Sequence, residues 1–216
     1  MACSWLTAAG AEVPSVPSGL VGEVDPARWE QAAELARSGL ASPLTSSIGR
    51  LFDAVAALCG VRATVTYEGQ AAIELEAVAA SAAGADPYPL ALRDARGQLE
   101  LDARQTVSEV ARDVARGADP AVVSARFHAA VASATVLACA RLAEENATEL
   151  VVLSGGVFNN RLLLERCVEP LEARGLRVLL PERLPAGDGG ISYGQAAVAA
   201  ARLIRRSSEP SGLLLR

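Results

Sequence analysis

One apolar run that ends at two glycines limits the possible fold and function of this chain more than any other segment does. Residues 149–153 favour a β-strand, residues 154–156 are Ser-Gly-Gly, and the pattern over 159–174 favours a helix. Glycine has no Cβ atom, so such a turn lets the backbone approach a phosphate or ribose, and the N–H groups that open the helix attract anions. The turn therefore predicts a ligand-binding loop, with an ordinary tight strand-to-helix turn as the alternative.

A second glycine-rich element lies at residues 187–190 and precedes a helix expected over 190–205. Asp188 has glycines on both sides, so its carboxylate can reach an open cleft and bind a cation, or it can cap the helix that follows. One carboxylate does not make a metal site, so an ion would need further ligands from elsewhere. In the first loop two amides follow the glycines, and we expect Asn160, in the first helical turn, to face the same cleft.

The C-terminal part of the chain alternates strand, helix, strand and helix, with the second strand expected over 177–180. Such alternation favours a parallel sheet covered by helices. Upstream, the patterns and caps predict helices over 26–39, 48–58, 70–83, 103–116 and 120–145, and a hairpin that joins 89–94 to 97–102. The fold class is therefore α/β with additional helices. We divide the chain into an irregular segment over 1–25, one lobe over 26–206 and a fraying tail over 207–216.

Gly49 and Asp53 form a third candidate pair, because Asp53 follows Gly49 by one helical turn on the same side. The backbone could approach a ligand at Gly49, and the Asp53 carboxylate could accept hydrogen bonds from ribose hydroxyls. Otherwise Asp53 is an acid on a helix surface. His128 is the only histidine and falls deep in an apolar helical pattern, so a packed histidine is favoured over a ligand or a base.

Charge and cysteine usage narrow the class of protein. All 20 basic residues are arginine and the net charge is −5, so the concentrated basic face of a nucleic-acid-binding protein is not expected. The chain has no charge-free apolar stretch of about 18 residues, so a membrane-spanning helix is not expected either. The four cysteines are scattered, without a C-x-x-C pair, which indicates a reducing, cytoplasmic setting.

Four blocks in this order resemble the carbamoyltransferase HypF family, which acts in the maturation of nickel–iron hydrogenases. They are residues 42–56, 67–72, 153–160 and 187–195. The resemblance implies an actin/hexokinase/Hsp70-like (ASKHA) fold, as a lobe of a Kae1-like transferase domain. It also implies that carbamoyl phosphate and ATP give carbamoyl-adenylate, whose carbamoyl group passes to the C-terminal cysteine of a HypE-like acceptor protein.

The same resemblance assigns expected roles to single residues. Gly49 and Asp53 match ribose-contacting positions, and Asn160 matches the amide near the adenylate. Gly155 and Gly156 match the loop that holds the nucleotide phosphates. Asp188 matches an aspartate that ligates the divalent metal ion, iron or magnesium.

The chain also departs from the family pattern. The family builds its metal site from a His-x-x-x-His motif plus aspartates, and this chain has one histidine outside such a motif. The zinc-binding and adenylate-forming regions of the family have no counterpart here, so we expect zinc only in that missing N-terminal part. Residues 1–25 then continue a truncated domain, and the chain alone holds half a cleft. We expect it to lack activity by itself and to self-associate through the bare cleft surface.

Two other classes of protein stay open at this stage. One is a non-catalytic scaffold, or a split-gene subunit that completes an enzyme made of two chains. The other is a different ASKHA enzyme, such as a tRNA threonylcarbamoyl transferase. The Phe158-Asn159 pair after the glycine loop and the block over 67–70 argue against the latter.

Overall fold

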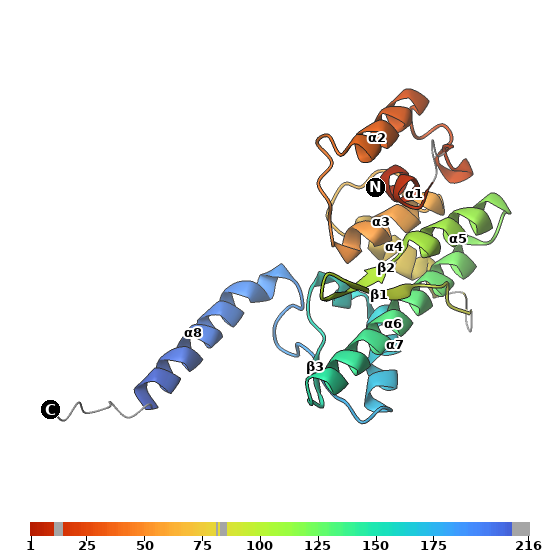
Figure 1. Cartoon of the computed structure of the whole chain (residues 1–216). Helices are drawn as coiled ribbons and strands as arrows, with labels where there is room; N and C mark the ends of the chain where they lie inside the picture. The colour runs from red at the N-terminus through yellow and green to blue at the C-terminus, as the bar shows by residue number, and fades with distance from the viewer. Residues whose placement is uncertain (11–14, 81, 83–85, 209–216) are drawn as a thin grey trace.

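The computed structural model describes residues 1–10, 15–80, 82 and 86–208. A helical body holds most of the chain, and one long helix leaves it near the C-terminus (Figure 1). The α-helices are α1 (Ala2–Ala8), α2 (Pro26–Ser38), α3 (Ile48–Leu58), α4 (Gln70–Ala79), α5 (Arg104–Ala115), α6 (Pro120–Glu145), α7 (Arg161–Glu172) and α8 (Ile191–Ser208). The strands are β1 (Ala91–Ala95), β2 (Gln98–Asp102), β3 (Leu150–Val152) and β4 (Arg177–Leu179), with 3-10 turns η1 (Ser18–Leu20), η2 (Gly156–Asn159) and η3 (Asp188–Gly190).

Helix α6 is the centre of the body and contacts α4, α5 and α7. It begins where the Asp119 carboxylate accepts a hydrogen bond from the backbone N–H of Ala121 at 2.8 Å, with a proline at the first helical position. Phe127 of α6 lies edge-to-face against Phe52 of α3, with ring centroids 4.9 Å apart, and both rings are fully buried. By length and composition α6 could cross a membrane, but most of its apolar window is buried, which identifies it as a core helix.

The N-terminal segment corrects one expectation. Residues 1–25 were expected to be irregular, yet the structure places helix α1 at their start, packed on α2 and α3. The Cys3 thiol donates a hydrogen bond to the backbone oxygen of Trp29 at 3.3 Å, and both side chains are buried. A helix of seven residues has little intrinsic stability, so this tertiary packing, rather than local propensity, accounts for α1.

Most of the other predicted elements are confirmed, with shifted ends. Helix α3 has the predicted bounds, and β1 and β2 pair antiparallel around the predicted turn. Helix α4 ends at Ala79, earlier than expected, and residues 81 and 83 of that prediction lie outside the described part of the chain. Helix α8 runs to Ser208, so it includes the start of the expected tail, and residues 209–216 lie outside the described part.

Strands β3 and β4 form a two-stranded parallel sheet, with Val151 opposite Val178. Helix α6 contacts β3 and helix α7 contacts β4, and Val151 is buried. The side chains that alternate with Val151 are exposed, at 44% for Leu150 and 61% for Val152. Parallel sheets are normally covered on both faces, so these apolar side chains mark an uncovered face.

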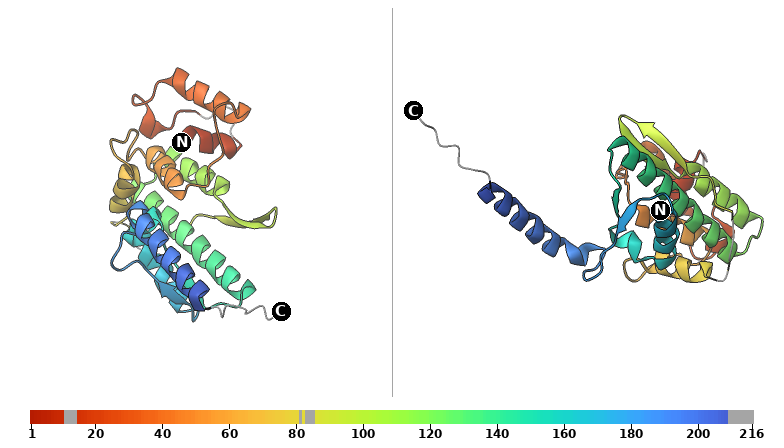
Figure 2. Two further views of the ribbon diagram at one scale, coloured as in Figure 1. Left: turned by 90° about the vertical axis from the view of Figure 1, so that its left-hand side faces the viewer. Right: turned by 90° about the horizontal axis from the view of Figure 1, so that it is seen from below.

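Helix α8 departs from the body, as Figure 1 and the right-hand view of Figure 2 both show. Every residue from 191 to 205 is exposed, although residues 196–201 are all alanine or valine. A helical stretch that is apolar on all sides normally lies buried. Helix α8 and the exposed face of β3 and β4 thus each present apolar side chains to the solvent.

Candidate functional site

The two glycine loops that the sequence singled out lie against each other. The backbone N–H of Gly155 donates to the carbonyl of Ala186 at 2.7 Å, and the Ser154 hydroxyl donates to the same oxygen at 3.3 Å. A Cβ atom on Gly187 would lie 3.3 Å from the Gly156 Cα atom. The backbones thus touch at a point where a side chain would force them apart, which explains why glycine stands there.

The outer side of the first loop is open. Gly155 has φ 105° and ψ 157°, a conformation in practice reserved for glycine, and a Cβ atom on Gly155 or Gly156 would meet no described atom within 4 Å. The N–H groups of Gly156 and Val157 have no acceptor within the described part of the chain. Unpaired N–H groups beside open space at the start of a helical turn suit an anion such as a phosphate.

Asn160 is the N-cap of α7 and does not lie inside its first turn. Its side-chain oxygen accepts a hydrogen bond from the backbone N–H of Leu163 at 2.8 Å, and its amide nitrogen lies 2.9 Å from Nε2 of His128. The side chain is buried, and both its polar atoms have protein partners. Asn159, by contrast, is exposed, and its amide nitrogen lies next to Gly187.

His128 is packed in the core, as the helical pattern around it suggested. It is fully buried, and its ring lies edge-on to Phe52 with centroids 5.2 Å apart. Nδ1 lies 2.8 Å from the carbonyl oxygen of Ser124. Burial, with a smaller contribution from the nearby Arg166 guanidinium, lowers the pKa of His128 to about 4. His128 is therefore neutral at physiological pH.

Gly49 and Asp53 lie on α3, which also contacts η2. Apart from its neighbours in the helix, a Cβ atom on Gly49 would meet only the Ser47 hydroxyl, at 3.8 Å, among the described atoms. Asp53 is half-buried. Burial raises the pKa of its carboxyl group, Arg50 opposes this, and the Glu68 carboxylate adds to it. Helix α4, which begins within the block over 67–72, contacts α3.

Asp188 begins η3 and is exposed. The described residues hold no group of three or more His, Cys, Asp or Glu side chains that could bind a metal ion. Asp188 also has no salt-bridge partner in the ranges that the structure describes. Among the described residues Asp188 is therefore a lone carboxylate, which does not hold a divalent ion by itself.

Sequence patterns gave no sign of one contact that supports the site. The carboxylate of Glu76 in α4 accepts a hydrogen bond from the backbone N–H of Leu162 at 3.1 Å. Together with Asn160 it satisfies two of the N–H groups that open α7. These two donors are therefore not available to a ligand.

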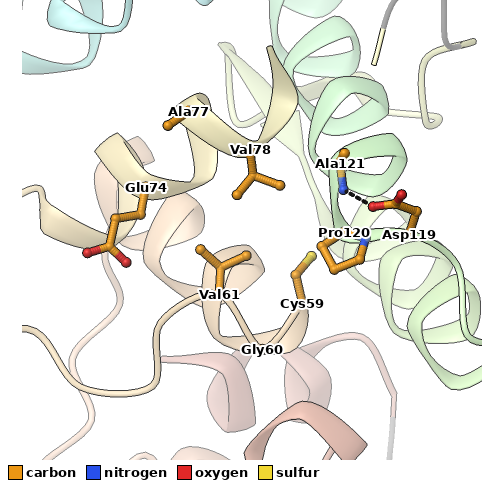
Figure 3. A pocket seen from close by; sticks show the side chains of 9 residues that line it. All are labelled: Cys59, Gly60, Val61, Glu74, Ala77, Val78, Asp119, Pro120 and Ala121. Atoms are coloured by element: carbon orange, nitrogen blue, oxygen red, sulfur yellow. Dashed lines mark hydrogen bonds between the residues drawn. The ribbon is translucent and has the colours of Figure 1, made fainter. Parts of the chain in front are cut away.

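A surface hollow of about 690 Å³ lies away from the glycine loops, between the end of α3, α4 and the start of α6 (Figure 3). Its polar residues are engaged in the protein, because Glu74 pairs with Arg62 at 2.6 Å and Asp119 caps α6. None of the predicted site residues lines it. The residues around it are Cys59, Gly60, Val61, Glu74, Ala77, Val78, Asp119, Pro120 and Ala121.

Solved structures resemble this lobe closely. A crystal structure of full-length HypF in a phosphate- and nucleotide-bound form matches with a TM-score of 0.78 and 35% identity, over 85% of this chain and 24% of that one. The structure of HypF from T. kodakarensis matches with a TM-score of 0.73 and 26% identity, over 88% of this chain and 24% of that one. The lobe thus has the ASKHA-type fold expected from its sequence.

Residues 1–195 match the family described as "Carbamoyltransferase, Kae1-like Domain, second subdomain". The chain therefore belongs to the HypF carbamoyltransferase family. The HypF of Rhizobium leguminosarum bv. viciae is 39% identical over 170 residues, which are 78% of this chain and 21% of that protein. A HypF homolog of Cupriavidus necator is 40% identical over 179 residues, or 78% of this chain and 44% of the relative. The chain spans about a fifth to under a half of these relatives.

Proposed function

We propose that this chain supplies one wall of a carbamoyl-adenylate site in a HypF-type carbamoyltransferase. The observation that carries the proposal is the contact between the two glycine loops, whose outer side is open and bears the unpaired N–H groups of Gly156 and Val157. Family membership and the nucleotide-bound relative support the same ligand class.

In this proposal the loop N–H groups hold the phosphate of ATP or of the adenylate, where they stabilise negative charge that develops during transfer. Gly49 lets the ribose approach α3, and Asp53 accepts from its hydroxyls. Asn160 belongs to the site because it directly follows the loop and caps α7. Carbamoyl phosphate and ATP are the substrates, and the acceptor is the terminal cysteine of a HypE-like protein.

Asp188 contributes one ligand to a divalent metal ion, iron or magnesium, whose other ligands come from outside this chain. When bound, such an ion would polarise an oxygen of the carbamoyl or phosphate group. Because a single exposed carboxylate does not fit a complete site, binding of the ion depends on the partner region. Zinc belongs to the same outside part of the family architecture.

The partner that we propose for this wall is the first subdomain of the Kae1-like domain. The matched family is described as a second subdomain, and longer relatives carry further chain. Helix α8 and the exposed face of β3 and β4 present the apolar surface that such a subdomain would cover. Without that cover the chain is inactive, and its apolar surface promotes self-association. Its four free cysteines fit a cytoplasmic protein.

Calorimetric titration with ATP tests this proposal. The chain is titrated alone and after co-expression with the region that precedes the matched segment in the Rhizobium leguminosarum relative. That region with its own matched segment serves as the positive control. Binding only in the combined sample supports the half-site, whereas carbamoyl-phosphate-dependent ATP turnover by the chain alone contradicts it.

A second candidate is a subunit of an enzyme split over two chains, or a scaffold without catalysis. The Cupriavidus necator homolog supports this candidate, because this chain covers 44% of that relative but 21% of the Rhizobium one, so family members differ in length. Restored turnover in the combined sample supports the split enzyme. Stable association without ATP binding supports the scaffold.

A further inference from the structure

A buried histidine and a buried asparagine connect the central helix to the glycine loop. His128 lies in the middle of α6 and is fully buried, with its ring against Phe52 and Phe127. Its Nε2 atom lies 2.9 Å from Nδ2 of Asn160, the residue that follows η2 directly. This contact joins elements 32 residues apart in the sequence.

The partners of the ring decide where its proton lies. Nδ1 is 2.8 Å from the carbonyl oxygen of Ser124, which only accepts hydrogen bonds, so Nδ1 carries the hydrogen. Nε2 is then an acceptor, and the Asn160 amide nitrogen donates to it. This assignment leaves the Asn160 side-chain oxygen to accept from the Leu163 N–H at 2.8 Å, so the amide has one orientation that satisfies both ends.

The glycine loop is held at both ends by such contacts. At its start, the Gly155 N–H donates to the Ala186 carbonyl at 2.7 Å. At its end, the Asn160 N–H donates to the Val157 carbonyl at 3.1 Å, and the Asn160 side chain is fixed by α6 and α7. The free N–H groups of Gly156 and Val157 lie between these two anchors. A change in the Asn160 side chain therefore acts on the donors of the loop.

We propose that neutral His128 is a positioning residue, which orients the anion-binding loop over 155–159 through its hydrogen bond with Asn160. The coupling between His128 and the loop stands on the contacts above, and its effect on nucleotide binding rests on the proposed function. His128 acts without touching the ligand. Arg166 of α7 is the charged group that faces the ring, and no carboxylate near the ring among the described residues stabilises a protonated form.

The variant Asn160→Asp tests the coupling with little change in shape. Aspartate still caps α7 through an oxygen on the Leu163 N–H, but it places an acceptor opposite Nε2 where the amide donated. Proton–nitrogen correlation spectra of the intact chain report the protonation state of the two ring nitrogens of His128. We expect wild-type His128 to stay neutral with the hydrogen on Nδ1 between about pH 5 and 8, and the variant to be protonated on both nitrogens there.

Hydrogen exchange of the backbone amides over 155–159 reports on the loop itself. We expect faster exchange in Asn160→Asp and in His128→Leu, and a return toward wild-type rates in His128→Gln, whose side-chain oxygen can accept from Asn160. Exchange in the middle of α5 serves as the internal control for an intact fold. If His128→Leu does not fold, Asn160→Asp carries the test.

Nucleotide binding provides the last measurement, on the chain combined with its proposed first subdomain. We expect about tenfold weaker ATP binding in Asn160→Asp, the effect of losing one well-placed contact. An unchanged ring state and unchanged loop exchange in Asn160→Asp overturn the positioning role. If the wild-type protein binds no ATP but the ring state and the loop exchange still respond to Asn160→Asp as expected, the positioning role stands. In that case the proposed ligand is wrong.

Discussion

Glu76 accepts a hydrogen bond from the backbone N–H of Leu162 at 3.1 Å, and this contact joins α4 to the first turn of α7 across 86 residues. The carboxylate is half-buried and lies at the positive end of the helix. Asn160 satisfies the next donor along the chain. Two side chains from different parts of the fold thus share the capping of one helix, next to the candidate ligand loop.

Replacing Glu76 by alanine should therefore destabilise the lobe. We expect a loss of about 1 kcal/mol in the free energy of unfolding, since a charged hydrogen bond to a helix N-terminus is removed. Urea denaturation followed by circular dichroism measures it. The matched control is Glu30→Ala, which removes an exposed helical glutamate of α2. Equal stability of the two variants would show that the cap contributes nothing.

The two loop glycines should respond differently to alanine. Gly155→Ala forces a side chain into a backbone conformation with φ 105°, so we expect a loss of about 1–3 kcal/mol. Gly156→Ala meets no steric obstacle and should change stability by less than about 1 kcal/mol. Thermal unfolding compares them.

The same Gly156→Ala variant separates stability from binding. Its methyl group would occupy the open space in which we place the phosphate, so ATP affinity of the combined protein should fall by at least about tenfold. Calorimetry at matched protein concentration measures the change. Wild-type affinity in this variant would place the phosphate elsewhere.

His128 should make stability depend on pH in a defined window. Its pKa is lowered from 6.5 to about 4 in the folded state, because burial disfavours the charged ring. The unfolded chain then binds a proton that the folded chain does not, so stability is full above about pH 6.5 and falls as pH decreases toward 4. The loss across this window amounts to roughly 3 kcal/mol.

Urea denaturation between these pH values checks this dependence. The variant His128→Gln should lose that part of the slope, and the protein has no other histidine to replace it. Asp102, whose pKa is lowered to about 2 chiefly by its hydrogen bond with Arg104, acts at lower pH. A flat stability profile between pH 5 and 7 in the wild-type chain would contradict the neutral, buried state of the ring.

Helix α8 should govern self-association of the isolated chain. Val198 is 52% exposed within the apolar stretch over 196–201, so Val198→Glu should lower the average mass in sedimentation at high concentration. Ile73→Glu in α4 is the control, since Ile73 is 55% exposed on a helix that packs into the body. A strictly monomeric wild-type chain would remove the basis for this prediction.

Local patterns were sufficient for much of the fold. The caps at Asp25 and Asp119 each precede a proline, and both helices begin there as expected. The expected bounds of α3 match the structure because its apolar residues repeat with helical spacing. Helix α1 was not foreseen, because its stability comes from packing on α2 and α3, which no local pattern records.

In the candidate site, too, local patterns predicted some features, and others depend on tertiary contacts. The glycines that precede two predicted helices singled out the two loops, and the structure places the backbones of these loops in contact. The burial of Asn160 could not be inferred locally, since an asparagine at a helix start looks the same whether it faces a ligand or a histidine 32 residues away. The roles of Gly49, Asp53 and Asp188 in ligand binding stay predictions.

The hydrogen bond between Gly155 and Ala186 has a consequence for the kinetics of recognition. Because this bond and the touching glycine backbones tie the two loops together, we expect them to move as one unit. A ligand that spans both loops would then order little additional backbone when it binds, and the entropic cost of complex formation is reduced in advance. Loosening this single link should shorten the residence time of the ligand more than it slows arrival, because encounter depends on diffusion and departure on how firmly the wall is held.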